Sequence, residues 1–161
     1  MKRVLFLCTG NSARSVIAEG LLRHLGQGRY LSYSAGSQPT GTPNPAALDV
    51  LRAHDIDASF ARSKSWDEFA APDGDIIDIV ITVCSNAAGE VCPIWPGHPV
   101  TAHWGVEDPA AITSPPEEVA KAFQKTFDEM SRRIDALLAL DEKLDDVRFV
   151  QMLRAIGKID D

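Results

Sequence analysis

The stretch that most constrains the fold of this chain is Val4–Ser15, which reads VLFLCTGNSARS. Four apolar residues lead directly into Cys8, a short polar loop follows, and a helical pattern begins near Arg14. A buried strand therefore delivers a thiol to a loop that closes on the N-terminus of a helix, where backbone amides favour an anion. The C-x5-R spacing of Cys8 and Arg14 lets both side chains face one tetrahedral oxyanion. We expect the same field to favour the thiolate of Cys8 over the thiol.

Composition excludes several classes of protein. The 161 residues suit one domain, and the net charge of -7 argues against a nucleic-acid partner. The apolar run after Met1-Lys2-Arg3 ends at Leu7, too short for a signal peptide, and no apolar segment has membrane-spanning length. Three cysteines, an odd number, do not make a secreted disulfide framework. We expect a cytoplasmic protein without a membrane partner, acting as a monomer.

Alternating strand and helix patterns predict an α/β fold: a single three-layer domain with a parallel sheet of about four strands and helices on both sides. After the first strand we expect helices over 15–25, 45–54, 116–140 and 144–156, a helical turn at 66–70, and strands at 31–34, 76–83 and 100–103. Residues 1–140 would form the domain. We expect 141–161 to be a helical extension packed on it, with a partner-docking helix as the alternative.

Cys8 and Cys84 both follow predicted strands. Ligands bind beyond the carboxyl ends of parallel strands, so these two thiols are predicted on one rim of the sheet. Cys92 shares a Pro- and Gly-containing loop with Cys84, and closing that short ring would cost little loop entropy. The alternative for each thiol is a buried or incidental cysteine. A metal site is disfavoured because the cysteines lack paired CxxC spacing.

The loop after Cys8 carries the predicted anion site. Arg14 at a helix N-terminus is electrostatically unfavourable unless an anion sits there, which favours a bidentate oxyanion clamp. Ser15 either caps the helix or donates to the Cys8 thiolate. Asn11 is expected to be structural, because asparagine tolerates the left-handed backbone. The predicted oxyanion-binding residues are Thr9, Gly10, Asn11, Ser12, Ala13, Arg14 and Ser15.

The segment Cys8–Ser15 resembles the phosphate-binding loop of low-molecular-weight protein tyrosine phosphatases and of the arsenate reductases that share their fold. The resemblance runs from about residue 2 to residue 140. The other segments that match are Ser34-Ala35-Gly36, Val83-Cys84-Ser85, Cys92-Pro93 and the HWG…DP segment His103–Ala110. The cysteine pair and the HWG…DP segment favour a reductase. Ala110-Ala111-Ile112 lacks the aromatic residue that the phosphatases carry after the DP pair.

The resemblance implies a mechanism. The Cys8 thiolate attacks arsenate, and Asp108, with Glu107 as the fallback, protonates the departing oxygen. Cys84 then attacks the Cys8 sulfur, arsenite leaves, and Cys92 frees Cys8 by thiol–disulfide exchange. Thioredoxin is the implied reductant of the Cys84–Cys92 disulfide, with glutaredoxin or a small thiol as alternatives.

Two further points concern the loop and its surroundings. Ala13 stands where the phosphatases and many of the reductases have a second loop cysteine, so oxidation of Cys8 should proceed to Cys84. No tightly bound cofactor is expected. Some related reductases bind a potassium ion, and the residues at roughly corresponding places are Asn11, Glu19, Ser34 and Asp67. The alternative is that these are ordinary polar residues.

Two rival functions remain at the level of sequence. A phosphomonoester phosphatase, hydrolysing through a Cys8 phosphoenzyme, would need Cys8, Arg14 and Asp108 but neither Cys84 nor Cys92. A non-enzymatic module that senses oxyanions or arsenicals through Cys8 is the third hypothesis, and the complete set of catalytic groups makes it the weakest.

Overall fold

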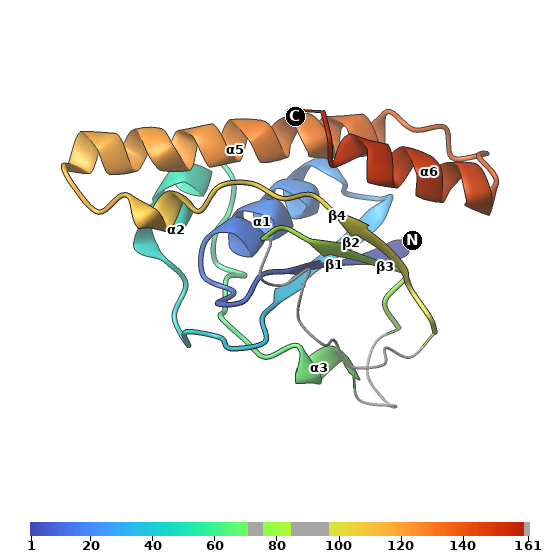
Figure 1. Ribbon diagram of the computed structural model, residues 1–161, viewed down its shortest axis with the longest axis horizontal. Helices are drawn as coiled ribbons and strands as arrows, with labels where there is room; N and C mark the ends of the chain where they lie inside the picture. The colour runs from blue at the N-terminus through green and yellow to red at the C-terminus, as the bar shows by residue number, and fades with distance from the viewer. Residues whose placement is uncertain (71–75, 85–96, 160–161) are drawn as a thin grey trace.

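A four-stranded parallel sheet lies at the centre of the computed structural model, which describes residues 1–70, 76–84 and 97–159 (Figure 1). The strand order is β2-β1-β3-β4, and the register aligns Val4 with Ser32 and Ile79. The strands are β1 (Lys2–Leu7), β2 (Tyr30–Ala35), β3 (Ile79–Thr82) and β4 (Val100–His103). The helices are α1 (Arg14–Leu25), α2 (Pro45–Ala53), α3 (Asp67–Ala70), η1 (Pro109–Ala111), α5 (Pro116–Leu138) and α6 (Asp146–Ile156).

The central strand β1 is apolar at four successive positions because both of its faces are covered. Val4 and Phe6 join the large hydrophobic cluster, whereas Leu5 and Leu7 join a smaller cluster on the other face. All four side chains are fully buried. A strand that alternated apolar and polar residues would leave one of these clusters without its centre.

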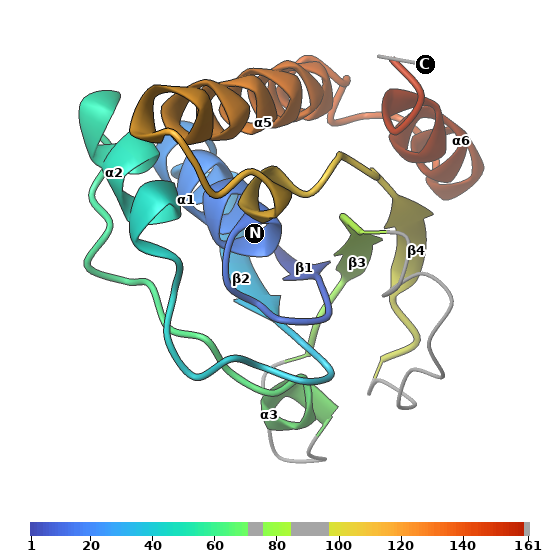
Figure 2. The same cartoon turned by 60° about the vertical axis from the view of Figure 1, so that its left-hand side comes forward.

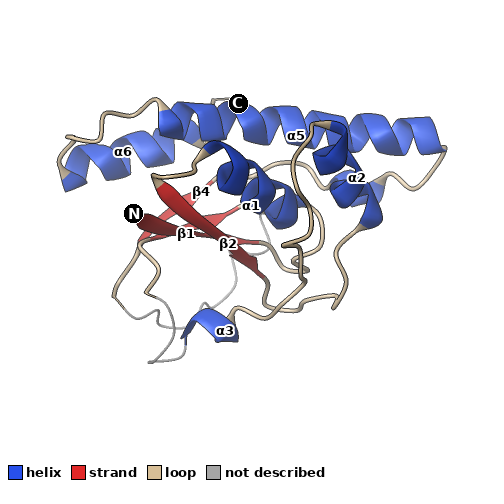
Figure 3. Cartoon of the chain, turned by 180° about the vertical axis from the view of Figure 1, so that it is seen from behind, coloured by secondary structure: helices blue, strands red, loops and turns tan. Residues whose placement is uncertain are grey.

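Helices cover the two faces of the sheet unequally. The long helices α1, α2 and α5 lie on one face, where they build the large cluster, and α6 lies beside β4 (Figure 2). The single-turn helix α3 lies on the opposite face, where Phe69 packs in the small cluster (Figure 3). The predicted parallel sheet with helices on both sides is therefore confirmed.

Element boundaries differ from the sequence expectation where packing decides them. The apolar run 76–83 yields only the four-residue β3, because its ladder partners are the short segments Val4–Leu7 and Val100–His103. The last helix begins later than predicted, because Asp145 caps it by accepting from the backbone N–H of Arg148. Within the described residues, no helix combines the length and apolarity needed to cross a membrane.

The topology brings the two candidate thiols to one edge. Cys8 directly follows β1, and Cys84 lies two residues after the neighbouring β3. The Val83 N–H donates to the Leu7 carbonyl, which keeps the two strand ends in register. The carboxyl ends of adjacent parallel strands meet at this edge, and the loop that starts α1 crosses it.

Candidate functional site

The loop between Cys8 and Arg14 turns its carbonyl groups outward. The carbonyls of Thr9, Gly10 and Ser12 each accept a backbone hydrogen bond, at 2.9 to 3.0 Å, from residues within 38–44. A loop whose carbonyls are occupied by a supporting segment can direct backbone N–H groups to its inner side, as in anion-binding nests. The predicted oxyanion loop therefore rests on a second layer of backbone.

Gly36 brings that second layer close to the loop. A Cβ atom at this position would lie 2.4 Å from the Thr9 carbonyl oxygen and 2.6 Å from that of Cys8. Both distances are far below van der Waals contact, and both atoms belong to backbone. The Ser34-Ala35-Gly36 segment therefore ends in glycine for a physical reason: only a residue without a side chain lets the turn after β2 approach the loop this closely.

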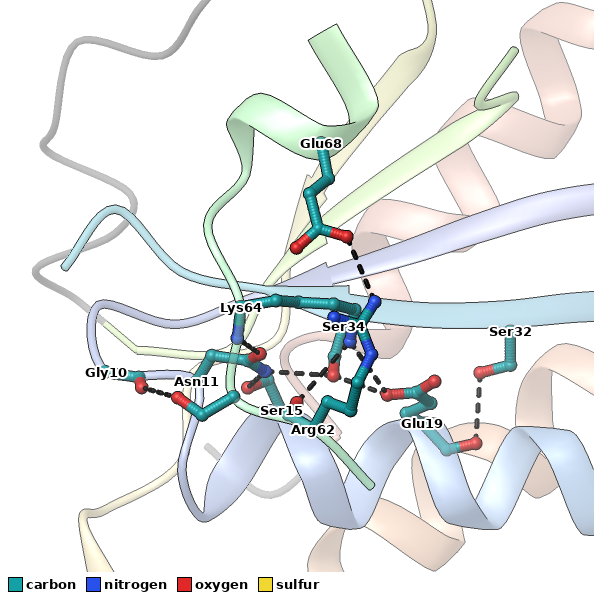
Figure 4. A network of polar contacts seen from close by, with 10 residues as sticks. Gly10, Asn11, Ser15, Glu19, Ser32, Ser34, Arg62, Lys64 and Glu68 are labelled. Atoms are coloured by element: carbon teal, nitrogen blue, oxygen red, sulfur yellow. Dashed lines mark hydrogen bonds and ion pairs between the residues drawn. The ribbon is translucent and has the colours of Figure 1, made fainter. Parts of the chain in front are cut away.

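Asn11 organises the loop from inside (Figure 4). It is fully buried and has a φ of 45°, the left-handed backbone that the sequence predicts for it. Its Nδ2 donates to the hydroxyls of Ser15 and Ser34, each at 2.9 Å, and its Oδ1 accepts from the backbone N–H of Lys64 at 2.9 Å. One side chain thus ties the loop to α1, β2 and the segment before α3.

Ser15 lies within α1, and the helix N-cap is Ala13, which makes no side-chain hydrogen bond to the first turn. Since neither an acidic residue nor a side-chain cap occupies that turn, its positive potential stays directed at the loop. The donation from Ser15 to the Cys8 sulfur stays a prediction. The hydroxyl of Ser15 accepts from Asn11.

Arg14 lies at the first position of α1 and reaches across the mouth of the loop. Its Nη1 donates to the Val106 carbonyl at 3.3 Å, and its Nη2 lies 3.8 Å from Asp108 Oδ2. The Arg14 side chain is 17 % exposed and that of Asp108 is 47 % exposed. The guanidinium of the largely buried Arg14 thus reaches from the loop toward the more exposed carboxylate of Asp108.

Asp108 is the carboxylate that faces this site. Its Oδ1 accepts from the Ala110 N–H at 3.0 Å, which fixes the carboxylate at the start of η1. The neighbouring Glu107 pairs instead with Lys125 of α5, at 3.6 Å, and is 90 % exposed. The geometry therefore favours Asp108 over Glu107 as the candidate proton donor.

Cys8 and Cys84 are both buried at the carboxyl ends of the neighbouring strands β1 and β3, and the Cys84 side chain acts on the Cys8 thiol. The Cys84 side chain, followed by burial, raises the pKa of Cys8 above the ordinary thiol value, while the charge of Arg14 lowers it. The predicted lowering of the Cys8 pKa is wrong for this arrangement, because the second thiol outweighs the guanidinium. The Thr9 N–H, predicted to bind the oxyanion, points to Cys84 Sγ at 3.4 Å. Thr9 therefore links the loop to the second thiol.

The predicted cation site contains an ammonium group instead of an open cavity. The structure brings Asn11, Glu19 and Ser34 together, and Ser34 Oγ donates to Glu19 Oε1. Lys64 Nζ lies 3.8 Å from the same oxygen, with both side chains almost fully buried (Figure 4). Burial raises the pKa of Glu19 and lowers that of Lys64, while each partner's charge opposes its shift.

These residues do not fit a potassium ion. The charge that the ion would contribute is supplied by Lys64, and the oxygens of Asn11 and Ser34 are engaged in hydrogen bonds. The fourth predicted ligand, Asp67, begins α3, where its backbone N–H donates to Ser65 Oγ. Over residues 1–70, 76–84 and 97–159, His, Cys, Asp and Glu form no cluster of three or more suited to a metal.

Cys92, the third predicted redox residue, lies outside the described residues. Sequence reasoning missed two buried cations near the site. Lys64 belongs to an irregular polar stretch, and Arg133 lies on α5, where its Nη2 donates to the Gly105 carbonyl at 3.3 Å. Neither carries a local motif; both are identified by the long-range contacts they make.

The chain is similar to known proteins in both sequence and structure. The family model described as low molecular weight phosphotyrosine protein phosphatase matches residues 3–148. An arsenate reductase of Bacillus licheniformis is 42 % identical over 137 residues, which cover 83 % of this chain and 92 % of that protein. The structure is also similar to the thioredoxin-dependent arsenate reductase of Corynebacterium glutamicum, with a TM-score of 0.62 and 28 % identity over 86 % of this chain and 60 % of that one. A low molecular weight protein tyrosine phosphatase of T. tengcongensis gives a TM-score of 0.67 at 28 % identity, over 89 % of this chain and all of that one.

Proposed function

Because the chain belongs to the low molecular weight phosphotyrosine protein phosphatase family, and its relatives include arsenate reductases, we propose that it reduces arsenate to arsenite with a thioredoxin-type reductant. The observation that carries this proposal is the position of Cys84 beside the Cys8 loop: the two cysteines follow adjacent parallel strands, and the Thr9 N–H lies 3.4 Å from Cys84 Sγ. Ester hydrolysis needs one thiol. Reduction needs a second thiol within reach of the first.

In the first step, the Cys8 thiolate attacks arsenic while the loop amides and Arg14 hold the oxyanion. An S–As bond forms and one As–O bond breaks. Asp108 protonates the departing oxygen, which leaves as water. The position of Asp108 opposite Arg14, at 3.8 Å, supports this role, since both groups face the same mouth.

In the second step, the Cys84 thiolate attacks the Cys8 sulfur. A Cys8–Cys84 disulfide forms, and the electron pair of the broken S–As bond stays on arsenic, which is thereby reduced from As(V) to As(III) and leaves as arsenite. The Cys92 thiolate then attacks Cys84 and releases Cys8 as a thiolate. A dithiol reductant of the thioredoxin type would return the Cys84–Cys92 disulfide to two thiols.

Coupled arsenate reduction tests this sequence in wild type and in Cys8→Ser, Cys84→Ser and Cys92→Ser. We expect no steady-state turnover in any of the three variants. Peptide mapping of Cys92→Ser after one equivalent of arsenate should show a Cys8–Cys84 disulfide. Hydrolysis of p-nitrophenyl phosphate by Cys84→Ser is the internal control for an intact loop. Full arsenate turnover by Cys84→Ser would eliminate the relay.

Phosphomonoester hydrolysis is the second candidate, supported by the family match and by the Cys8, Arg14 and Asp108 arrangement. Fast hydrolysis of p-nitrophenyl phosphate, insensitive to Cys84→Ser and without arsenate reduction, would favour it.

We further infer that the protein acts as a cytoplasmic monomer. Light scattering on the purified chain tests the monomeric state, and cell fractionation tests the cytoplasmic location.

A further inference from the structure

The C-terminal helix α6 lies mostly beyond the family match, which ends at residue 148, and it packs beside β4 (Figure 1, Figure 2). Its buried residues are Phe149, Leu153 and Ile156. The strand β4 is one of the two edge strands of the sheet, and it runs directly into the segment that carries Asp108. The extension is therefore packed where the acid-bearing segment begins.

Trp104 connects this helix to that segment. The side chain of Trp104 is fully buried, and its Nε1 donates to the Leu153 carbonyl at 3.0 Å. Because α6 ends at Ile156, the Leu153 carbonyl is one of the last four of the helix, which lack the usual intrahelical partner. A buried indole N–H also requires an acceptor. Each group thus satisfies the other, and α6 and Trp104 are coupled by one bond.

Two more contacts hold the end of α6 against β4. A Cβ atom on Gly157 would lie 2.1 Å from the His103 carbonyl oxygen and 3.0 Å from the indole Cδ1 of Trp104. Arg154 Nε donates to the Thr101 carbonyl at 3.1 Å. The helix end is therefore in close backbone contact with the residues just before the acid segment.

From Trp104 onward, hydrogen bonds hold successive residues of the acid segment. The Trp104 N–H donates to the Thr82 carbonyl at 2.7 Å, and the carbonyl of Gly105 accepts from Arg133. The Val106 N–H donates to the Val83 carbonyl, and its own carbonyl accepts from Arg14. The chain reaches Asp108 two residues later, so a displacement at Trp104 is transmitted along a segment with little freedom to absorb it.

We propose that α6 positions the acid segment 104–108 through the Trp104–Leu153 hydrogen bond, which makes Trp104 and α6 positioning elements for proton donation by Asp108. The proposal rests on the role of Asp108 in the proposed function. A general acid must lie within hydrogen-bond reach of the departing oxygen. A misplacement of about 1 Å can cost on the order of 100-fold in rate.

The test compares substrates with a poor and a good leaving group, because misplacement of the acid should affect them unequally and a general loss of stability should not. Proton donation matters most for a poor leaving group, so we compare kcat/KM for phenyl phosphate and p-nitrophenyl phosphate, two probes for the same loop. Trp104→Phe keeps an aromatic side chain but replaces the indole with a smaller phenyl ring that has no N–H. We expect its rate with phenyl phosphate to fall about tenfold more than its rate with p-nitrophenyl phosphate. Asp108→Asn should show the same discrimination more strongly. Phe69→Leu, a destabilising change on the opposite face of the sheet, should show none.

Arg154→Ala, a change on an exposed hydrogen bond, is the second variant should Trp104→Phe fold poorly. We expect its rate with phenyl phosphate to fall about twofold to threefold more than its rate with p-nitrophenyl phosphate, since only one of the contacts is lost. Equal losses on both substrates in Trp104→Phe and Arg154→Ala, with discrimination retained in Asp108→Asn, would overturn the role of α6 and leave the acid assignment standing. Absence of discrimination in Asp108→Asn would instead overturn the acid assignment, and this inference with it.

Discussion

Cys8 and Cys84 are both buried at the carboxyl ends of the adjacent strands β1 and β3, where the Cys84 side chain acts on the Cys8 thiol and the Thr9 N–H lies 3.4 Å from Cys84 Sγ. The arrangement means that the second nucleophile of the proposed relay already lies beside the loop that carries the first. The backbone N–H of Thr9 points at Cys84 Sγ, so the loop that follows Cys8 also contacts the second thiol.

Removing the second thiol should make Cys8 more acidic. The Cys84 side chain is the largest cause that raises the pKa of Cys8, and the charge of Arg14 acts in the opposite direction. In Cys84→Ala the largest raising cause is lost, while burial still raises the pKa of Cys8 and the charge of Arg14 still lowers it, so the thiolate should form at lower pH than in wild type. We expect the midpoint of the pH profile for iodoacetamide alkylation of Cys8, followed by peptide mapping, to move to lower pH.

The matched control is Arg14→Met, which removes the lowering cause and should move the same midpoint to higher pH. Peptide mapping is necessary because the sequence contains a further thiol, Cys92, whose alkylation must be counted separately. An unchanged or higher midpoint in Cys84→Ala would show that the Cys84 side chain does not govern the acidity of Cys8.

Much of this site follows from local sequence, and the remainder depends on contacts between distant segments. The C-x5-R loop, the strand before it and Asp108 all lie in segments with a periodic pattern or a motif, so their positions could be predicted. Lys64 lies in an irregular stretch, and only the folded chain brings it to Glu19. The raised pKa of Cys8 does not follow from local sequence for the same reason: the side chain that raises it most, that of Cys84, lies 76 residues away in the chain.

Removing either partner of the buried Lys64–Glu19 ion pair alone should destabilise the fold. Both side chains are almost fully buried, and Glu19 also accepts from Ser34 within the network that holds Asn11. Lys64→Ala would leave a carboxylate buried without its cation, which should lower the free energy of unfolding by about 3–5 kcal/mol. Urea unfolding measures the loss.

Two comparisons sharpen this prediction. The double variant Lys64→Met/Glu19→Leu should recover most of the loss, because no buried charge remains. The exposed pair Lys121–Glu118 is the control, and Lys121→Ala should change stability little. If potassium chloride stabilises Lys64→Ala more than choline chloride at equal ionic strength, a cation can replace the ammonium. A Lys64→Ala protein as stable as wild type would contradict the role assigned to this pair.

Arg14→Lys should reduce catalysis without unfolding the protein. The side chain is 17 % exposed and reaches both Val106 and Asp108, so its guanidinium spans the mouth of the loop. Lysine keeps the charge but lacks the planar fork that binds two oxygens of an oxyanion. We expect kcat/KM for arsenate to fall about 100-fold, equivalent to about 2.7 kcal/mol. Steady-state kinetics measure this, with Arg52→Lys as a surface control. A loss below about threefold would argue against bidentate binding.

Gly36→Ala should damage the oxyanion loop from behind. The added Cβ would lie 2.4 Å from the Thr9 carbonyl oxygen and 2.6 Å from that of Cys8, and neither backbone atom can rotate away. The loop must shift, so we expect the free energy of unfolding to fall by about 1–3 kcal/mol and arsenate turnover to fall about 100-fold.

Gly28→Ala is the matched control for Gly36→Ala. Gly28 has a φ of +85° and no atom within 4 Å of an added Cβ, so alanine there meets backbone strain but no clash. We expect this variant to lose about 1–2 kcal/mol of stability with unchanged turnover, because the turn after α1 lies at the opposite end of β1 from Cys8. Gly28→Ala thus measures the effect of backbone strain alone, and Gly36→Ala measures the effect of a steric clash with the loop. Equal turnover in the two variants, measured by coupled arsenate reduction beside urea unfolding, would show that the approach of Gly36 does not shape the loop.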